Sequence, residues 1–409
     1  MSSAVTWVHG LGRDGRILFA TAGLRSFAFG FLAVILGPYL SGHGFSAEAI
    51  GTIFAAALVG SALMTVAFAG VADRLGRRRV LVVSAGLMAL GGAGFALTVN
   101  PLLLIAAAVI GTISPSGKDV GPFLSVEQAI LPQTVADRDR TSLFAAYNVV
   151  SSLGGALGAL AVGAPEALGI EAAAGARALL WGYVAIAVVM AALFAALSPA
   201  AEAPASEAPS ARRGLGLARS RGIVIRLAAL FALDSFAGGF VVQGLVAYWF
   251  YLRYGVDPAG LAGIFFGVNL FSALSFLAAA PLARRIGLLN TMVFTHLPSN
   301  VLLILVPLMP SLSLAVTVLL ARHLLSQLDV PTRQSYTMAV VVPDERSAAA
   351  GVIAVARNAA SAVAPALAGL TLANPVLGAP FLIAGALKIV YDLAILATFR
   401  HVRPPEESR

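Results

Sequence analysis

Ionisable side chains occur inside stretches of this sequence that are otherwise apolar. Arg25 and Arg322 carry guanidinium groups, which are forked donors suited to a carboxylate or a phosphate. Asp119, Glu127 and Asp234 carry carboxylates that can take up and release a proton. An ionised residue at the centre of a bilayer costs roughly 3 kcal/mol, so each should have a partner or face a watery cavity. The residues concerned are Arg25, Lys118, Asp119, Glu127, Asp234, Arg322, Asp329, Arg333, Arg357, Lys388 and Asp392.

The surrounding composition places these charges in a lipid bilayer. The chain has 409 residues, of which 59% are apolar and 11% are charged, and its mean hydropathy is +0.90. Segments of about 20 apolar residues span roughly 30 Å of hydrocarbon as helix. The segments are apolar on both faces, which disfavours the alternating strands of a barrel. We therefore predict an all-α membrane protein with twelve transmembrane helices, at 17–40, 46–71, 79–99, 102–131, 141–164, 177–198, 222–252, 258–283, 287–307, 311–341, 347–372 and 376–399.

The distribution of arginine predicts the orientation. Positive residues in short loops stay in the cytoplasm. With the amino terminus inside, the arginines between the predicted spans fall in cytoplasmic loops, except Arg177 and Arg253. We expect a multi-pass protein of the bacterial inner membrane with both termini cytoplasmic. The first sixteen residues lack the apolar core of a signal peptide, so the first span is expected to be retained.

Charge and cysteine content exclude several partners. Contact with anionic lipid headgroups explains the net charge of +8, so no nucleic-acid partner is needed. The chain has no cysteine, which excludes disulfides and thiolate metal sites. We expect no cofactor and no metal. Membrane lipid, a small-molecule solute and protons are the expected partners of a monomer.

A linker and an internal repeat divide the chain. The segment 198–210 is rich in Pro, Ala and Ser. It separates the first six predicted helices from the last six. We assign 1–198 to an N-terminal six-helix bundle, 199–221 to a cytoplasmic linker and 222–409 to a C-terminal six-helix bundle. Glu127 aligns with Arg333 at an offset of 206 positions, and Tyr147 aligns with Arg357 at an offset of 210. These matches predict pseudo-symmetric halves, and such repeats place a polar site near the midplane between them.

The turn between the second and third predicted spans indicates a family. Its residues Ala69–Leu81 resemble the signature G-x-L-A-D-R-x-G-R-R-x-x-L of the major facilitator superfamily, with Ala69 in place of the first glycine. The layout of six helices, linker and six helices also resembles that family. The resemblance implies alternating access, with the turn bracing the cytoplasmic ends of the halves. The implied gating residues are Asp73, Arg74, Gly76, Arg77 and Arg78; the alternative is that they only fix topology.

The family plan also implies where a substrate binds. Its helices one, four, seven and ten line the cavity, which implies a substrate-binding role for Arg25, Lys118, Asp119, Asp234, Arg322 and His323. At about 1.5 Å per residue, Arg25 lies about 12 Å and Arg322 about 16 Å into the membrane. One arginine from each half can then clamp an anionic group. The alternative is that Arg25 pairs with Asp234 or Asp119 and only holds helices together.

Further charged residues are predicted to pair or to gate. Arg322, Ser326, Asp329 and Arg333 follow helical spacing and predict one polar stripe on the tenth span. Glu127 and Arg333 are predicted to close an inner gate as an ion pair, and Arg357 is a further gating candidate. The alternative is separate pairing, of Glu127 with Arg140 and of Arg333 with Asp329. We expect Lys388 and Asp392 to neutralise each other and His296 to be a core residue.

These features predict a secondary active transporter of a small polar, anionic solute, with proton coupling through Asp234, Asp119 or Glu127. One alternative is an exporter of amphipathic compounds. However, the helix-four arginine and the helix-five Gly-Pro pair of the family's drug:proton antiporters are absent from 102–131 and 141–164. A second alternative is a non-transporting receptor or scaffold, which the short loops disfavour. No histidine, carboxylate and nucleophile have the spacing of a catalytic group, so we do not expect an enzyme.

Overall fold

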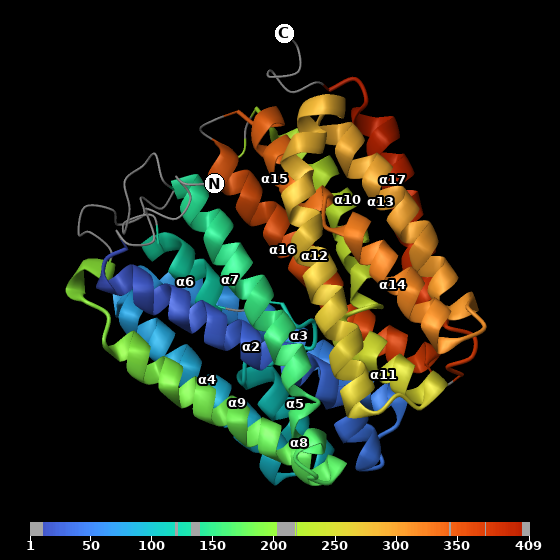
Figure 1. Cartoon of the computed structure of the whole chain (residues 1–409). Coiled ribbons are helices and arrows are strands. Elements are labelled where there is room, and N and C mark those ends of the chain that lie inside the picture. Colours follow the sequence, from blue (N-terminus) through green and yellow to red (C-terminus); the bar gives the residue numbers. More distant parts are fainter. Residues whose placement is uncertain are drawn as a thin grey trace. The chain divides into compact units, whose positions relative to one another are not determined.

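The computed structural model describes residues 11–118, 122–131, 140–202, 217, 219–342, 345–372 and 374–402. In these residues every regular element is a helix, which confirms the all-α prediction (Figure 1). Two short 3₁₀ helices, η3 (Pro199–Ala201) and η5 (Val306–Leu308), accompany the α-helices. The α-helices are α2 (Arg13–Gly42), α3 (Ala47–Leu75), α4 (Arg77–Leu97), α5 (Pro101–Ile110), α6 (Pro122–Ile130), α7 (Arg140–Ala161), α8 (Ala164–Ala167), α9 (Ala172–Ala195), α10 (Arg221–Gly239), α11 (Gln243–Tyr254), α12 (Pro258–Ile286), α13 (Leu288–Leu305), α14 (Leu312–Ser326), α15 (Asp329–Val340), α16 (Arg346–Thr371) and α17 (Ala379–Phe399).

Ten helical stretches in the described part are long and apolar enough to cross a membrane. Two of these stretches combine consecutive helices, α10 with α11 and α14 with α15. The remaining two predicted spans fall on α5 with α6 and on α7, where the apolar helical stretches Pro101–Ile110 and Ala146–Ala161 are shorter. The total of twelve spans therefore stays a prediction.

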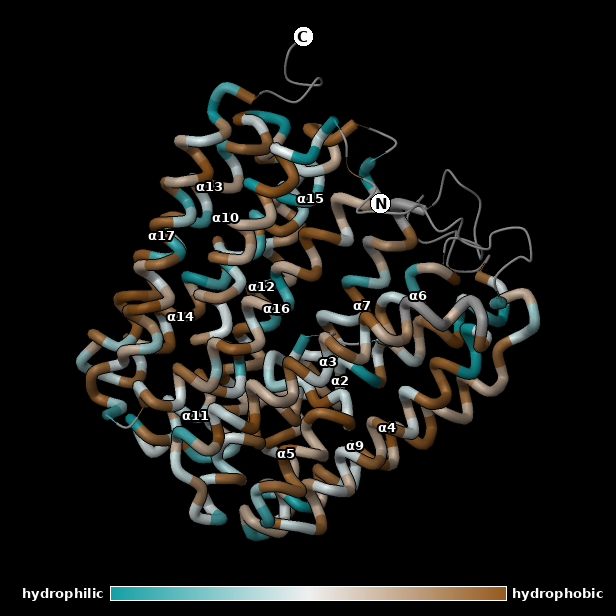
Figure 2. Tube along the Cα trace, turned by 180° about the vertical axis from the view of Figure 1, so that it is seen from behind, coloured by the Kyte–Doolittle hydropathy of each residue, from teal (hydrophilic) through white to brown (hydrophobic). Residues whose placement is uncertain are grey.

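The surface of the helices suits a lipid environment. Large apolar side chains are exposed along them, including Leu63 at 61%, Leu90 at 66% and Leu102 at 76%. Figure 2 shows hydrophobic residues running along the helices. Such exposure would be costly in water but is neutral against hydrocarbon. The chain is an integral multi-pass membrane protein.

The chain forms two compact units with the same internal pairing of helices. The first comprises Met1–Pro209 with Val256–Phe266, and the second comprises Ser210–Gly255 with Gly267–Arg409. In the first unit α2 packs mainly on α7, and α4 on α9; in the second, α10 packs mainly on α16, and α13 on α17. Counted along the predicted spans, helices one and five pair as seven and eleven do, and three and six pair as nine and twelve do. This recurrence is the pseudo-symmetry that the repeat predicts.

Glycines allow the close contact between α2 and α7. A Cβ atom built on Gly158 would lie 2.0 Å from the carbonyl oxygen of Phe27, and one on Gly30 would lie 2.3 Å from that of Gly155. Small residues at these points let the two backbones approach, which is the usual packing mode of membrane helices.

We expect Gly158→Ala to destabilise the protein by about 1–3 kcal/mol, because the added methyl group must push α2 and α7 apart. Thermal unfolding of the purified protein in detergent measures this effect. Gly182→Ala on α9 is the matched control, since its Cβ would have no atom within 4 Å. A loss of stability in the control as large as that in Gly158→Ala would contradict the packing argument.

Candidate functional site

The first unit contains a buried ion pair between α2 and α6. Arg25 Nη1 donates to Glu127 Oε1 at 2.8 Å, and Arg25 Nη2 donates to Oε2 at 2.7 Å. Both side chains are fully buried. The Tyr147 hydroxyl on α7 donates to Glu127 Oε2 and accepts from Arg25 Nη2 at 2.9 Å. The Phe123 ring lies 4.9 Å from the guanidinium carbon. This bidentate, hydrogen-bonded geometry is what a buried pair needs to offset its desolvation.

The pairing of Arg25 with Glu127 differs from the partners that the sequence predicts for either residue. The predicted span 102–131 is interrupted after Ile110, and α6 begins anew at Pro122. Because α6 is a separate helix, the face on which Glu127 lies cannot be extrapolated from the start of the span. An inner gate between Glu127 and Arg333 would require both residues to leave the partners they have inside their own units, and it stays a prediction.

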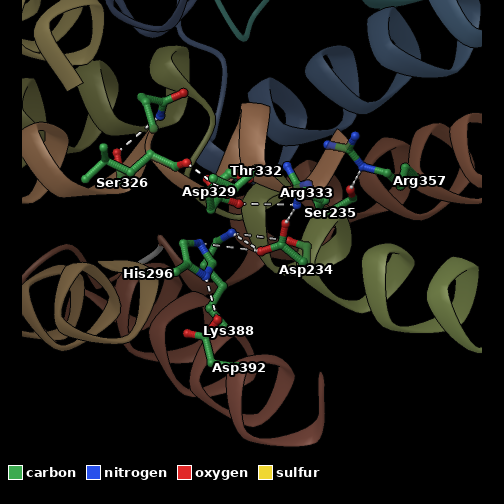
Figure 3. A network of polar contacts seen from close by, with 12 residues as sticks. Asp234, Ser235, His296, Ser326, Asp329, Thr332, Arg333, Arg357, Lys388 and Asp392 are labelled. Atoms are coloured by element: carbon green, nitrogen blue, oxygen red, sulfur yellow. Dashed lines mark hydrogen bonds and ion pairs between the residues drawn. The ribbon is translucent and has the colours of Figure 1, made fainter. Parts of the chain in front are cut away.

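The second unit holds a larger network centred on Asp234 of α10 (Figure 3). Asp234 Oδ1 accepts from Lys388 Nζ on α17 at 2.5 Å, and Oδ2 accepts from Arg333 Nη1 on α15 at 2.8 Å. Arg333 Nη1 also lies 3.5 Å from Asp329 Oδ2, the separate pairing predicted for Arg333. All four side chains are buried. One carboxylate therefore neutralises cations from two different helices.

A second carboxylate, Asp392 on α17, is joined to this network through a histidine. Asp392 Oδ1 lies 2.8 Å from His296 Nδ1, and Oδ2 accepts from Asn300 Nδ2 at 2.8 Å. His296 Nε2 in turn lies 3.8 Å from Asp234 Oδ1. The predicted pairing of Lys388 with Asp392 is wrong, because Lys388 binds the carboxylate of the neighbouring helix. The prediction that His296 is a buried, satisfied residue is confirmed.

The two clusters occupy equivalent places in the repeat with their charges reversed. Arg25 and Glu127 join the first and fourth predicted spans, whereas Asp234 and Arg333 join the seventh and tenth. Tyr147 contacts the first pair, and its repeat equivalent Arg357 donates from Nε to Ser235, next to Asp234, at 3.0 Å. A neutral hydroxyl in one half is thus replaced by a third cation in the other.

Two arginines near the Asp234 network, Arg322 and Arg357, have no ion-pair partner among the described residues. Arg357 is bonded to the Ser235 hydroxyl, and Arg322 Nη1 lies 3.3 Å from His323 Nε2. The Nε of Arg322 is buried without a hydrogen bond. Both side chains are only partly buried. Around Asp234 the unit sets four basic side chains, Arg322, Arg333, Arg357 and Lys388, against three acidic ones, Asp234, Asp329 and Asp392.

The helices that carry these charges are broken at corresponding positions of the two halves. The fourth predicted span divides into α5 and α6, and the tenth divides after Ser326 into α14 and α15. The predicted polar stripe from Arg322 to Arg333 is therefore shared by two helices and is not one continuous face. Broken helices at matching positions of a repeat mark binding sites in transporters, because freed backbone groups there line a cavity.

The other predicted substrate residues are Lys118, His323 and Asp119. Lys118 is exposed in the loop after α5, where its carbonyl oxygen accepts from Ser114 Oγ at 2.7 Å. His323 Nδ1 lies 2.8 Å from the carbonyl oxygen of Leu319. Asp119 is outside the described residues. Among the described side chains, no group of three or more His, Asp or Glu residues could hold a metal ion.

A family model described as Major Facilitator Superfamily matches residues 18–326, more than half of the chain. The chain belongs to the major facilitator superfamily. It is 26% identical to the uncharacterized membrane protein YJR124C of Saccharomyces cerevisiae, over 95% of this chain and 94% of the yeast protein.

Solved structures of this superfamily share the fold. The nucleoside transporter NupG has a TM-score of 0.73 at 15% identity, over 94% of this chain and 99% of that one. A D-xylose-proton symporter has a TM-score of 0.72 at 15% identity, over 95% and 98%. The human organic anion transporter MFSD10 has a TM-score of 0.68 at 18% identity, over 94% and 99%. These likenesses confirm the predicted superfamily fold.

The superfamily turn after α3 is capped by a residue that sequence analysis missed. Gly76 has φ +96°, a conformation that favours glycine, and it directly precedes α4. Glu202, beyond α9, accepts from the backbone N–H groups of Arg77 at 2.6 Å and Arg78 at 3.3 Å. The side chains of Asp73 and Arg74 lie outside the described residues. A requirement for glycine and an acidic cap goes beyond what positive-inside anchoring needs.

Proposed function

We propose that this protein is a secondary active transporter that moves a small anionic solute by alternating access, with protons as the coupling ion. The observation that carries the proposal is a pair of arginines beside the Asp234 network, Arg322 and Arg357, that have no carboxylate partner in the described part of the chain. Guanidinium groups in a partly dehydrated setting need a counter-charge, and a carboxylate or phosphate supplies one with matching geometry.

The repeat supports a positive site in the second unit. In the first unit the positive charge of Arg25 balances the negative charge of Glu127, and Tyr147 adds no charge. In the second unit the residue equivalent to Tyr147 is Arg357. It adds one positive charge beyond those that the ion pairs of the Asp234 network contain. The break between α14 and α15 separates Arg322, on α14, from Arg333, on α15. The solved structures that share this fold include an organic anion transporter and a D-xylose-proton symporter, so the fold is compatible with both parts of the proposal.

Asp234 is the proposed proton carrier. Its two carboxylate oxygens bind Lys388 and Arg333, so protonation would release two cations at once. His296 links it to Asp392, which gives the proton a second acceptor within the same unit. A change of protonation here would thus alter the charge offered to an anion at Arg322 and Arg357.

The remaining parts of the proposal follow the layout of the superfamily. The halves 1–198 and 222–409, joined by 199–221, rock about a central site, and the turn that contains Asp73, Arg74, Gly76, Arg77 and Arg78 braces them. Both termini lie in the cytoplasm of a bacterial inner membrane, and the protein acts as a monomer. Glu127, Arg333 and Arg357 rearrange as the inner side opens.

A ligand screen by thermal unfolding tests the sign of the solute. We expect succinate or another small organic anion to raise the unfolding temperature, and neutral xylose and the lipophilic cation tetraphenylphosphonium to leave it unchanged. Arg322→Gln and Arg357→Gln should each weaken the anion effect about tenfold or more, since each removes a charge-assisted contact. Arg285→Gln, an exposed arginine at the end of α12, is the control. Stabilisation by the lipophilic cation alone would overturn the anionic assignment.

A further inference from the structure

Asp392 is a buried carboxyl group that pairs with no lysine or arginine among the described residues. Its exposure is 1%, and it lies on α17, which packs against α13. The groups bonded to it are the imidazole of His296 and the amide of Asn300, and neither is a permanent cation. An ionised carboxylate is costly to bury without a cation. A proton on Asp392 removes this cost.

The other acidic groups of the network are already balanced. Asp234 binds Lys388 at 2.5 Å and Arg333 at 2.8 Å, and Asp329 lies 3.5 Å from the same guanidinium nitrogen. These two carboxylates and two cations together carry no net charge. An ionised Asp392 would add an uncompensated negative charge to this buried cluster, whereas a protonated Asp392 adds none.

The hydrogen bonds around Asp392 fit its protonated form. Asn300 Nδ2, which can only donate, lies 3.1 Å from His296 Nδ1 and 2.8 Å from Asp392 Oδ2. If Nδ1 carries no hydrogen, it accepts from Asn300, and Asp392 Oδ1 at 2.8 Å must donate its own proton to it. Oδ2 is then the carbonyl oxygen and accepts the other hydrogen of the amide. With an ionised Asp392, a hydrogen on Nδ1 would face a second donor as well as its acceptor.

The first unit shows that the fold does not need polar groups at this place. There α4 packs on α9 as α13 packs on α17. We count from the glycines directly before α4 and α13 and from the buried phenylalanines near the ends of α9 and α17. The corresponding residues are Ala85 and His296, Ala89 and Asn300, Tyr183 and Lys388, and Ala187 and Asp392. The second unit therefore has a polar cluster where uncharged residues are enough for packing.

We propose that Asp392 holds the coupling proton, and that His296 passes this proton between Asp392 and Asp234. His296 Nε2 lies 3.8 Å from Asp234 Oδ1, the oxygen that also binds Lys388 (Figure 3). Lys388 must therefore leave before Nε2 can approach this oxygen. A protonated Asp234 gives its proton to Nε2 while Nδ1 gives its own proton to Asp392 Oδ1. Asp234 returns to its ionised form, and the imidazole is neutral before and after the transfer.

This inference rests on the proposed function and specifies how the proton is coupled to the anion. With Asp392 neutral, Arg322 and Arg357 keep positive charges that the balanced ion pairs of the network do not offset. When the proton leaves, the negative charge on Asp392 weakens the attraction of these arginines for an anion. The charged and titratable groups around the pair are Asp234 on α10, Arg322 and His323 on α14, Asp329 and Arg333 on α15, Arg357 on α16, and Lys388 and Tyr391 on α17.

Infrared spectroscopy of the full-length protein in detergent tests whether Asp392 holds a proton. At neutral pH we expect the C=O stretch of a protonated carboxylic acid, a form that exposed carboxyl groups do not take there. Asp392→Asn should remove this band, and Glu166→Gln, at an exposed carboxyl group of α8, should leave it unchanged. A band that is absent from the wild type, or that survives Asp392→Asn, would overturn the proposal.

Two substitutions at the same position separate a protonated Asp392 from an ionised one. Asp392→Asn reproduces the shape and the hydrogen bonds of the protonated group, so the unfolding temperature should change by less than about 2 °C. Asp392→Leu leaves His296 and Asn300 without these bonds and should lower the unfolding temperature by about 5 °C or more. Equal losses in the two variants would show that Asp392 is an ionised partner of His296 and would contradict the assignment.

The pH dependence of anion binding tests the coupling. Stabilisation of the wild type by succinate should weaken as the pH rises from neutral, and in Asp392→Asn it should not depend on pH. His296→Gln should keep the infrared band but lower uptake driven by a pH gradient at least about tenfold. An unchanged pH dependence in Asp392→Asn, or full uptake in His296→Gln, would contradict the inference. A wild type that shows the band but is stabilised by no anion would contradict the proposed function alone, because the band is measured without solute.

Discussion

Arg25→Met is expected to lower the stability of the protein by about 3–5 kcal/mol, because it removes the guanidinium that binds both oxygens of the buried Glu127 carboxylate. Glu127 is fully buried, and the hydroxyls of Tyr147 and Thr21 also donate to it. A hydroxyl cannot neutralise a carboxylate in a low-dielectric core. Thermal unfolding in detergent should show a fall of roughly 5–15 °C.

The matched control replaces the whole cluster. Arg25→Met combined with Glu127→Leu and Tyr147→Phe leaves no buried charge or orphaned hydroxyl, so most of the lost stability should return. A triple variant as unstable as Arg25→Met would show that the pair is not the cause. The same variant also tests the predicted substrate role of Arg25. If the arginine only holds α2 to α6 and α7, transport will recover with stability; if it binds the solute, transport will stay lost.

Asp234→Asn is expected to abolish transport driven by a pH gradient. An amide cannot carry the proton, and it leaves Lys388 and Arg333 without their shared carboxylate. Proteoliposomes loaded with a pH-sensitive dye, and given the anion that stabilises the wild type, measure the coupled proton movement. We expect at least about a hundredfold loss, together with a loss of stability of about 3–5 kcal/mol.

Two further variants separate coupling from stability. Asp234→Asn with Lys388→Met removes one cation together with the carboxylate and should recover much of the stability, while proton-driven transport stays lost. Glu166→Gln, an exposed carboxylate in α8, should change neither quantity. Retention of proton-coupled transport in the stable double variant would exclude Asp234 as the proton carrier and would favour Asp392 with His296.

The sequence showed which charged residues lie within apolar stretches, but it predicted few of their ion-pair partners correctly. Apolar runs made Arg25, Glu127, Asp234 and Arg333 conspicuous, and helical spacing correctly associated Arg333 with Asp329. The same spacing rule was wrong for Lys388, because a lysine reaches several ångströms from its helix and a carboxylate on α10 was nearer than Asp392. The repeat alignment of Tyr147 with Arg357 was a usable signal for the third member of each cluster.

The sequence by itself determined that this protein lies in a lipid bilayer, that it is helical and which superfamily it belongs to. Each of these depends on composition or on residues that are neighbours along the chain. Local order also located the turn at Gly76, whose positive φ a glycine accommodates. The tertiary structure alone decided that Arg25 binds Glu127, that Asp234 binds Lys388 and that Glu202 caps α4. These partners lie on helices far apart in sequence, and packing and helix breaks determine which faces meet. Spacing along one helix specifies a face, but it does not specify the helix opposite.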